Sequence, residues 1–130
     1  MDSSDDAEIR NTLARFCRLL DDRRFDEVGE LFAPHGRMGR TAGRDQIVEM
    51  LGRGGLARTP GLFRKHVTGN IVLDTGDGTA RAESDLVMFE RFDGGPWELR
   101  MGVYRDTLER ADGRWLFTDR QLTWTANGLR

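Results

Sequence analysis

Three aspartate–glycine turns divide the second half of the chain and constrain its fold more than any other feature. They separate four strand-like runs, at residues 64–74, 79–92, 97–110 and 114–125. The turns are Asp77-Gly78, Asp93-Gly94-Gly95 and Asp112-Gly113. Such dipeptides between strand-like runs are strong hairpin signals, because they tolerate the backbone angles of a tight turn. The pattern predicts an antiparallel meander. The third and fourth runs exceed the usual strand length, so we expect them to bend, with Gly102 as the candidate position.

The first half of the chain is predicted to be mainly helical. Residues 5–22 carry one apolar stripe at helical spacing, made of Ile9, Leu13, Phe16, Cys17 and Leu20. Further helices are predicted over residues 25–32 and 43–52, the first of them ended by Ala33-Pro34-His35-Gly36. Residues 37–42 are predicted to be a short strand or an extended link. The glycine-bearing stretch 52–62 is either a lid or a simple connection.

The order of these elements predicts the fold class. Helices followed by a curled antiparallel sheet indicate an α+β fold. A sheet curved around one long helix encloses a cone, and the mouth of that cone is a natural pocket. The 130 residues suit a single domain spanning 1–130.

Composition narrows the function classes. The chain has 22 acidic and 20 basic residues, without a long run of one sign, which argues against a nucleic-acid surface. Cys17 is the only cysteine, so an internal disulfide is excluded, and its place in the apolar stripe predicts an inert core residue. The acidic N-terminus lacks the pattern of a secretion signal, and no apolar run approaches membrane-spanning length. We therefore expect a cytoplasmic protein without a membrane or nucleic-acid partner.

His66 is the main candidate for chemistry. Its place in the first strand-like run puts it on a face shared with Thr68, Asn70 and Val72. Histidine is the side chain whose ordinary pKa suits proton transfer near neutral pH, although a lone histidine on a strand is also commonly structural. A carboxylate that accepts its ring N–H would fix the tautomer and stabilise the imidazolium.

Asp21 is the candidate for that carboxylate. At about 100° per residue, Asp22 points nearly opposite the apolar stripe, whereas Asp21 lies at its border beside Cys17. The alternative interpretation of Asp21 is a surface acid at the end of a helix.

Two further polar residues lie on predicted strands. Arg120 shares a largely apolar strand face with its alternate neighbours Leu116, Thr118, Leu122 and Trp124. Its guanidinium would stabilise an oxyanion or bind a carboxylate, or else form an ion pair with Asp106 or Asp119 on the outer surface of the sheet. Tyr104 shares a face with Gly102 and Asp106, where it would donate a hydrogen bond to a substrate oxygen or serve as an ordinary strand residue.

Other catalytic signatures are weak or missing from the sequence. His35 is expected to be exposed in the Pro-His-Gly turn. The two histidines lack metal-binding spacing, and the chain has no nucleophile elbow, P-loop or dinucleotide fingerprint. We therefore expect no metal and no cofactor. Trp97, Trp115 and Trp124 are interpreted as sheet packing.

Several short segments together resemble a known family. They are Leu20-Asp21, Phe25-Asp26-Glu27-Val28, Leu31-Phe32-Ala33-Pro34, Gly43-Arg44-Asp45-Gln46-Ile47, His66-Val67-Thr68-Gly69-Asn70, Tyr104-Arg105-Asp106-Thr107-Leu108, Asp112-Gly113-Arg114-Trp115 and Asp119-Arg120. In this order and spacing they resemble the SnoaL-like branch of the NTF2-like, or ketosteroid-isomerase-like, superfamily over nearly the whole chain. The resemblance implies a cone of curved antiparallel sheet around the first helix, often as a homodimer or homotrimer.

The resemblance also implies an activity. The pattern is most similar to members that eliminate or isomerise without a cofactor, namely scytalone dehydratase, bile-acid dehydratase and hexachlorocyclohexane dehydrochlorinase. These use a strand histidine as base, an aspartate near the end of the first helix and, in some, an arginine on the last strand. His66, Asp21 and Arg120 fall on those positions, and Tyr104 matches a tyrosine that some dehydratases use. Phe16 departs from the pattern, because several dehydratases have tyrosine there.

The leading hypothesis is therefore a lyase or isomerase that uses a His66–Asp21 dyad. Its substrate would be small, mostly apolar and perhaps cyclic in a pocket lined by Phe16, Leu20, Met88 and Trp124. One alternative is a non-catalytic module that binds a hydrophobic ligand or serves as a partner subunit. That alternative needs the cone but no dyad, and it gains support if His66 lies beyond hydrogen-bond reach of Asp21 or if both face solvent. Another is a ketosteroid-isomerase-like carboxylate base, Asp85 or Asp106, which would need deep burial and a raised pKa.

Overall fold

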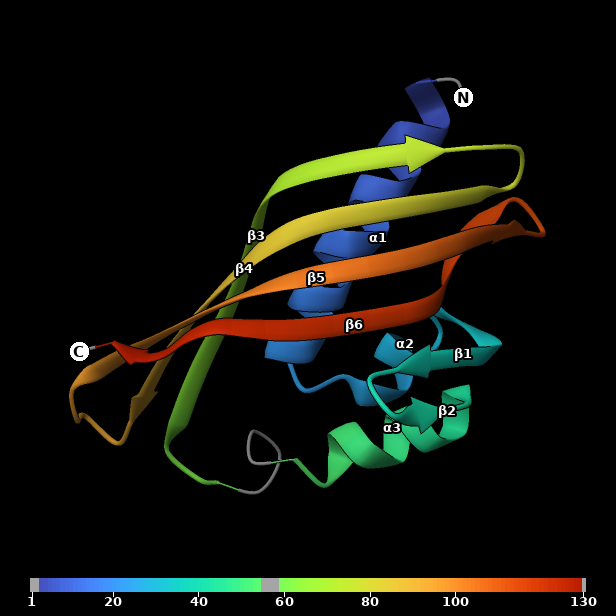
Figure 1. Cartoon of the computed structure of the whole chain (residues 1–130). Coiled ribbons are helices and arrows are strands. Elements are labelled where there is room, and N and C mark those ends of the chain that lie inside the picture. Colours follow the sequence, from blue (N-terminus) through green and yellow to red (C-terminus); the bar gives the residue numbers. More distant parts are fainter. Residues whose placement is uncertain (1–2, 55–58, 130) are drawn as a thin grey trace.

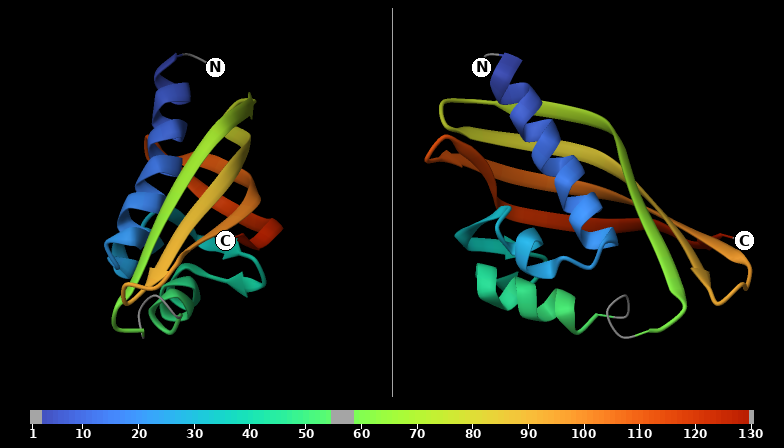
Figure 2. Two further views of the ribbon diagram at one scale, coloured as in Figure 1. Left: turned by 90° about the vertical axis from the view of Figure 1, so that its left-hand side faces the viewer. Right: turned by 180° about the vertical axis from the view of Figure 1, so that it is seen from behind.

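A six-stranded sheet curves around one face of a long N-terminal helix (Figures 1 and 2). The computed structural model describes residues 3–54 and 59–129. The helices are α1 (Ser3–Asp21), α2 (Phe25–Gly29) and α3 (Arg44–Gly52). The strands are β1 (Phe32–Met38), β2 (Thr41–Ala42), β3 (Leu62–Thr75), β4 (Thr79–Phe92), β5 (Trp97–Ala111) and β6 (Arg114–Leu129). They lie in the order β2-β1-β6-β5-β4-β3.

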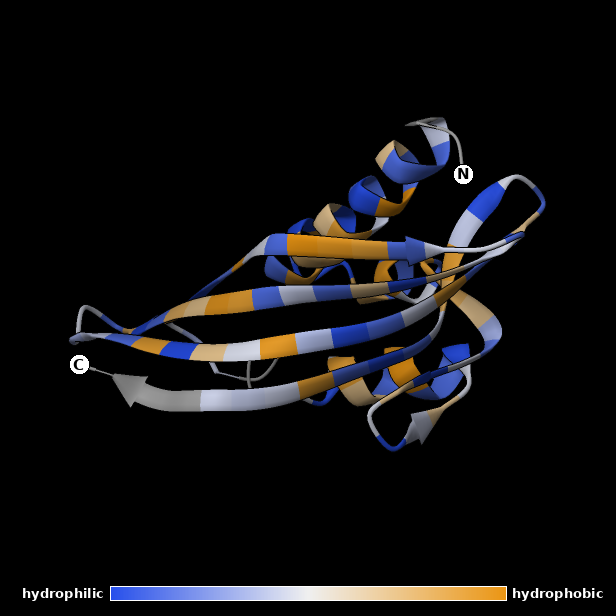
Figure 3. Cartoon of the chain, turned by 45° about the horizontal axis from the view of Figure 1, so that its top comes forward, coloured by the Kyte–Doolittle hydropathy of each residue, from blue (hydrophilic) through white to orange (hydrophobic). Residues whose placement is uncertain are grey.

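The four long strands confirm the predicted meander. The Asp-Gly pairs lie in its turns. Asp112 and Gly113, with φ of 52° and 75°, form the two-residue turn between β5 and β6 that the favoured hairpin geometry requires. Asp93 and Gly94 have φ of 46° and 77° in the longer connection between β4 and β5, and Gly78 has a φ of 71° between β3 and β4. Hydrophobic and hydrophilic bands succeed one another along β4 and β5 (Figure 3). The sheet therefore has an inner face toward α1 and an outer face away from it.

The bend predicted at Gly102 coincides with shifts in the pairing of β5 and β6. A methyl group at this position would lie 2.9 Å from both Leu122 Cδ1 and Thr123 O. Only glycine therefore lets β6 approach this closely.

α1 fills the inner side of the sheet with the apolar stripe read from its sequence. All five stripe residues are buried: Ile9, Leu13, Phe16, Cys17 and Leu20. Phe16 makes edge-to-face contacts with Phe32, Tyr104 and Phe117, with ring centroids 6.0 to 6.3 Å apart. The core thus joins the helix to the first strand and to the last two strands.

β1 differs from the prediction. The short second helix ends at Gly29, and Phe32, Pro34, His35 and Gly36 belong to a strand that pairs in parallel with β6. The sheet is therefore mixed rather than wholly antiparallel, and it does not close into a barrel. Pro34 and His35 fall in the irregular stretch of this ladder between the pairs at Phe32 and Arg37, where a missing backbone N–H costs no ladder hydrogen bond.

No helix in residues 3–54 and 59–129 is both long and apolar enough to cross a membrane.

Candidate active site

Asp21 and His66 meet at the end of α1. Asp21 Oδ1 lies 2.6 Å from His66 Nδ1, and the backbone N–H of His66 donates to both carboxylate oxygens at 3.2 Å. The two side chains are only 9% and 7% exposed. Asp22, in contrast, is exposed, as the helix phase predicted.

This contact orients the imidazole. An ionised carboxylate can only accept hydrogen bonds, so the N–H at Nδ1 of His66 donates to Asp21. In a neutral imidazole the lone pair is then on Nε2. Lys65 Nζ lies 3.7 Å from Asp21 Oδ2 and adds positive charge beside the carboxylate. Asp21 therefore favours the neutral tautomer that carries its proton on Nδ1.

The predicted pocket residues lie in the interior or on the inner face with His66. Met88 is the partner of His66 in the β3–β4 register, and Trp124 is paired with Gly102 in β5. Phe16, Leu20 and Met88 are buried, and Trp124 is about one-third exposed. Their role as a substrate pocket remains a prediction.

Sequence reasoning missed Arg100. It pairs with Met88 on the inner face, and its guanidinium carbon lies 5.9 Å from the centre of the Trp124 ring. Its position was predictable from the sequence. Every second residue of a strand lies on the same face, so Asp106, Tyr104 and Gly102 are followed on that face by Arg100.

Arg120 lies inside the protein, which corrects one of its two sequence interpretations. It does pair with Asp106, with Nε 3.5 Å from Oδ1, but both side chains are 0% exposed and not on the outer surface of the sheet. Its guanidinium carbon lies 3.5 Å from the centre of the Tyr104 ring, 4.2 Å from that of Phe16 and 4.6 Å from that of Phe117. These rings stabilise a buried cation.

Of the four neighbours expected for Arg120, Leu122 and Trp124 share its face, whereas Leu116 and Thr118 do not. The β5–β6 register shifts so that Leu108 pairs with Phe117, and Asp106 with Arg120. Thr118 is the extra residue of this bulge. Phe117, rather than Leu116 or Thr118, therefore packs with Arg120.

The polar atoms around Arg120 lack hydrogen bonds. Within the described residues, its three guanidinium nitrogens, both Asp106 carboxyl oxygens and Ser84 Oγ are buried without a hydrogen-bond partner. Burial raises the pKa of Asp106 to about 6; the Arg120 charge opposes this rise, and Asp119 adds to it. Asp106 thus has the deep burial and raised pKa required of a carboxylate base. Asp85, the other candidate, is exposed and accepts a hydrogen bond from Asn70.

Tyr104 and Cys17 occupy the interior between the two charged pairs. Burial raises the pKa of the Tyr104 hydroxyl well above its usual range, so it stays protonated. Burial also raises the pKa of the Cys17 thiol, and both Arg120 and Asp21 are close enough to influence it. The thiol is therefore a core group, as predicted. Cys17 lies near both Arg120 and Asp21 in the interior.

The remaining candidates lie elsewhere. His35 is 68% exposed, as expected, but on β1 rather than in a turn. The proposed lid at residues 52–62 lies partly outside the described residues. Within residues 3–54 and 59–129, no group of three or more His, Cys, Asp or Glu side chains is placed to hold a metal ion.

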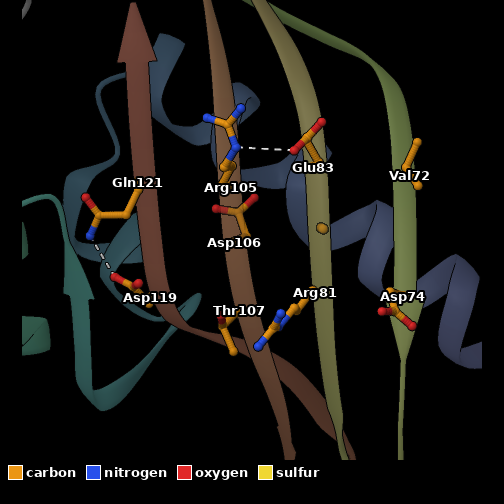
Figure 4. Close-up of a pocket in the computed structure, with 10 residues that line it drawn as sticks. Val72, Asp74, Arg81, Glu83, Arg105, Asp106, Thr107, Asp119 and Gln121 are labelled. Carbon is orange, nitrogen blue, oxygen red and sulfur yellow. Dashed lines mark hydrogen bonds and ion pairs between the residues drawn. The ribbon is translucent and has the colours of Figure 1, made fainter.

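A separate pocket of about 550 Å³ lies on the outer face of the sheet (Figure 4). It is lined by Val72, Asp74, Arg81, Ala82, Glu83, Arg105, Asp106, Thr107, Asp119 and Gln121. Several of its polar groups interact with one another: Arg105 pairs with Glu83 at 3.2 Å, and Gln121 donates to Asp119 at 2.8 Å. This pocket lies on the opposite face of the sheet from His66, whose side chain contacts Asp21 of α1.

Comparison with solved structures supports the fold. An NTF2-like protein with a cystatin-like fold from Novosphingobium aromaticivorans has a TM-score of 0.86 at 23% identity, covering 94% of this chain and 82% of that chain. ActVI-ORFA from Streptomyces coelicolor has a TM-score of 0.84 at 20% identity, covering 96% and 98%. A proposed scytalone dehydratase from Novosphingobium aromaticivorans has a TM-score of 0.82 at 23% identity, covering 95% and 85%. At these identities the likeness concerns the fold alone.

Sequence comparison identifies the family. None of the curated proteins matches this chain. Residues 1–121, however, match the SnoaL-like domain. Together with the curved sheet around α1 and the NTF2-like neighbours, this match shows that the chain belongs to the SnoaL-like domain family.

Proposed function

We propose that this protein is a cofactor-independent lyase or isomerase in which His66 removes a proton from a carbon acid. The observation that carries the proposal is the 2.6 Å contact between His66 Nδ1 and Asp21 Oδ1, with both side chains buried. A binding module needs no such dyad, and a separated or solvent-facing pair would have favoured that alternative, so this contact supports the proposal. The predicted apolar lining suits a small cyclic substrate.

The proposed mechanism begins with the imidazole. Asp21 holds Nδ1–H, and Nε2 accepts a proton from the carbon next to a carbonyl group. The electrons of the broken C–H bond form an enolate, whose negative charge Arg120 stabilises. In an elimination, these electrons form a carbon–carbon double bond as the leaving group departs from the β carbon with its bonding pair. In an isomerisation, the imidazolium returns the proton to another carbon.

Phe16 affects proton abstraction and departure of the leaving group differently. Abstraction needs only the base and the stabilising charge, whereas departure of hydroxide needs a proton. Phe16 supplies no hydroxyl, so water or the imidazolium would have to protonate the leaving group. We therefore expect proton abstraction to be the more robust step.

The test uses a hydroxytetralone with its hydroxyl β to the carbonyl. This probe is suggested by the proposed scytalone dehydratase among the structural neighbours. Loss of water yields an aromatic naphthol, measured by absorbance. Deuterium uptake at the α carbon, measured by NMR in D₂O, reports abstraction alone.

His66→Ala should lower both rates by about 10²- to 10⁴-fold, the usual contribution of a positioned base. Asp21→Asn should lower them too, because the amide cannot stabilise the imidazolium as a carboxylate does. His35→Ala removes the exposed histidine and serves as the matched control. Wild-type rates in His66→Ala would refute the mechanism.

A second candidate base is Asp106, favoured by its burial and its pKa of about 6. If Asp106 were the base, Asp106→Asn would abolish deuterium uptake while His66→Ala retained it. The same probe therefore separates the two assignments.

A further inference from the structure

The outer face of the sheet carries a continuous apolar surface across β3, β4 and β5. The members of this outer patch are Phe63, Val67, Val87, Phe89, Trp97, Leu99, Met101 and Val103. They alternate along their strands with inner-face residues such as His66 and Met88. The most exposed members, at 40% to 51%, are Phe63, Val67, Phe89 and Trp97. The described helices lie on the inner side of the sheet, so the outer patch faces away from them (Figures 1 and 2).

The size of the outer patch indicates an interaction surface. Three strands about 4.8 Å apart, over eight residues of about 3.4 Å each, cover about 400 Å². Apolar patches of about 300–600 Å² are commonly functional. A stable interface buries about 800 Å² of each partner, with an apolar core and a polar rim. The outer patch is therefore large enough for such a core, and charged side chains farther along the same face, such as Glu83 and Arg105, supply a rim.

The two cations within the outer patch interact with other parts of the chain. Lys65 Nζ lies 3.7 Å from Asp21 Oδ2, and Arg91 donates from Nε to Gly95 O at 2.8 Å. The exposed surface between them consists of aromatic and aliphatic side chains rather than of a basic cluster. Such a surface fits an apolar protein face better than an anionic lipid surface.

We propose that the outer patch binds a second copy of this chain in an antiparallel, two-fold symmetric dimer. The strand register places His66, Met88 and Arg100 in one row on the inner face. The proposed axis lies between the two outer faces and crosses the strands over this row. Two-fold symmetry then brings each residue before the row opposite the residue equally far beyond it in the partner, and every contact occurs twice.

The residues opposed in this way complement one another in size and charge. The pairs are Phe63 with Gly69, Lys65 with Val67, Phe89 with Val87, Arg91 with Asp85, Trp97 with Val103 and Leu99 with Met101. Each aromatic ring meets a smaller residue, and Gly69 has open space around it that Phe63 of the partner subunit fills. The exposed carboxylate of Asp85 meets the cation of Arg91. This self-complementarity is the reason for choosing a second copy as the occupant.

The first test is the mass of the protein in solution. Light scattering between about 1 and 100 µM should give twice the chain mass of 14.8 kDa. Phe89→Lys should weaken the dimer about 10²- to 10⁴-fold, because each copy loses a buried ring worth about 10- to 100-fold. Phe92→Lys is the matched control, since this exposed phenylalanine of β4 lies on the inner face, and it should leave the mass unchanged.

Charge reversal tests the two-fold arrangement and separates it from a folding defect. Asp85→Arg and Arg91→Asp should each weaken self-association at least about tenfold, because each opposes like charges twice. Mixing the two variants should restore the dimer, since both pairs are then oppositely charged. Misfolded variants would not recover on mixing.

The proposal is overturned if wild type is a monomer at about 100 µM or a trimer. It is equally overturned if Phe89→Lys leaves the dimer intact, or if the two charge variants fail to combine. A monomer that binds phosphatidylcholine vesicles through Phe89 would assign the outer patch to a lipid surface instead. The proposed reaction does not enter these measurements, because the outer patch lies on the opposite face of the sheet from His66.

Discussion

The buried Asp106 carboxyl makes the stability of the fold depend on pH in a direction unusual for an aspartate. Burial raises its pKa from 3.8 to about 6, against the attraction of Arg120. At about 1.4 kcal/mol per pKa unit, ionising this group costs about 3 kcal/mol more in the folded protein than in the unfolded chain. The Coulomb attraction at 3.5 Å therefore does not repay the loss of hydration.

The direction of this pH dependence follows from whether the folded or the unfolded state holds the Asp106 proton more tightly. The folded protein binds this proton up to about pH 6 and the unfolded chain only up to about pH 3.8. The stability contributed by the protonated carboxyl is complete below pH 3.8 and is lost as the pH rises through 6. Other groups titrate in the same window, so the effect must be isolated by a variant.

Asp106→Asn provides that isolation, because an amide does not titrate. Urea unfolding should be measured for both proteins at intervals between pH 3.5 and 7.5. The free energy of unfolding of wild type, minus that of the variant, should fall by about 3 kcal/mol over this range. Asp85→Asn, at an exposed aspartate, should show no comparable fall. A constant difference for Asp106→Asn, or one that grows with pH, would show that Arg120 stabilises the ionised form and would refute the reasoning.

Two further substitutions test the packing that positions the site. Arg44 donates from Nε and Nη2 to the backbone oxygen of Phe32 at 3.1 and 2.7 Å, so Arg44→Ala should lower the unfolding free energy by about 1–2 kcal/mol in urea, while Arg53→Ala, at an exposed site, changes it little. Gly102→Ala should lower the unfolding free energy by about 1–3 kcal/mol, because the new methyl group would clash with β6. Gly69→Ala, at a position with open space around it, should be nearly neutral. Equal thermal unfolding of these two variants would contradict the close packing at Gly102.

Local sequence signals predicted most of the fold because they are strong in this chain. The Asp-Gly turns require positive φ angles, and these define the hairpins whichever strands they join. The stripe on α1 follows from helical spacing alone. β1 was missed because Pro34 and Gly36 normally end regular structure, and its parallel partner β6 lies about 80 residues later. Only tertiary contacts make such a segment a strand.

The same distinction applies to the site. Helix phase was sufficient to choose Asp21 over Asp22. Alternation placed Tyr104 and Asp106 on one face but could not say that this face is buried, because an aspartate on a strand is usually exposed. The bulge at Thr118 then shifted β6 by one residue, which no periodicity argument detects. The buried pair of Asp106 and Arg120 therefore emerged only from the register of the two strands.

The stripe of α1 connects the two charged groups that the proposed reaction needs. Phe16 lies against the Arg120 guanidinium, and Asp21 holds His66. These two positions are five residues apart, which is about 7.5 Å along a helix axis. The proposed abstraction and the proposed charge stabilisation therefore both depend on α1, because Asp21 contacts the imidazole and Phe16 packs against the guanidinium.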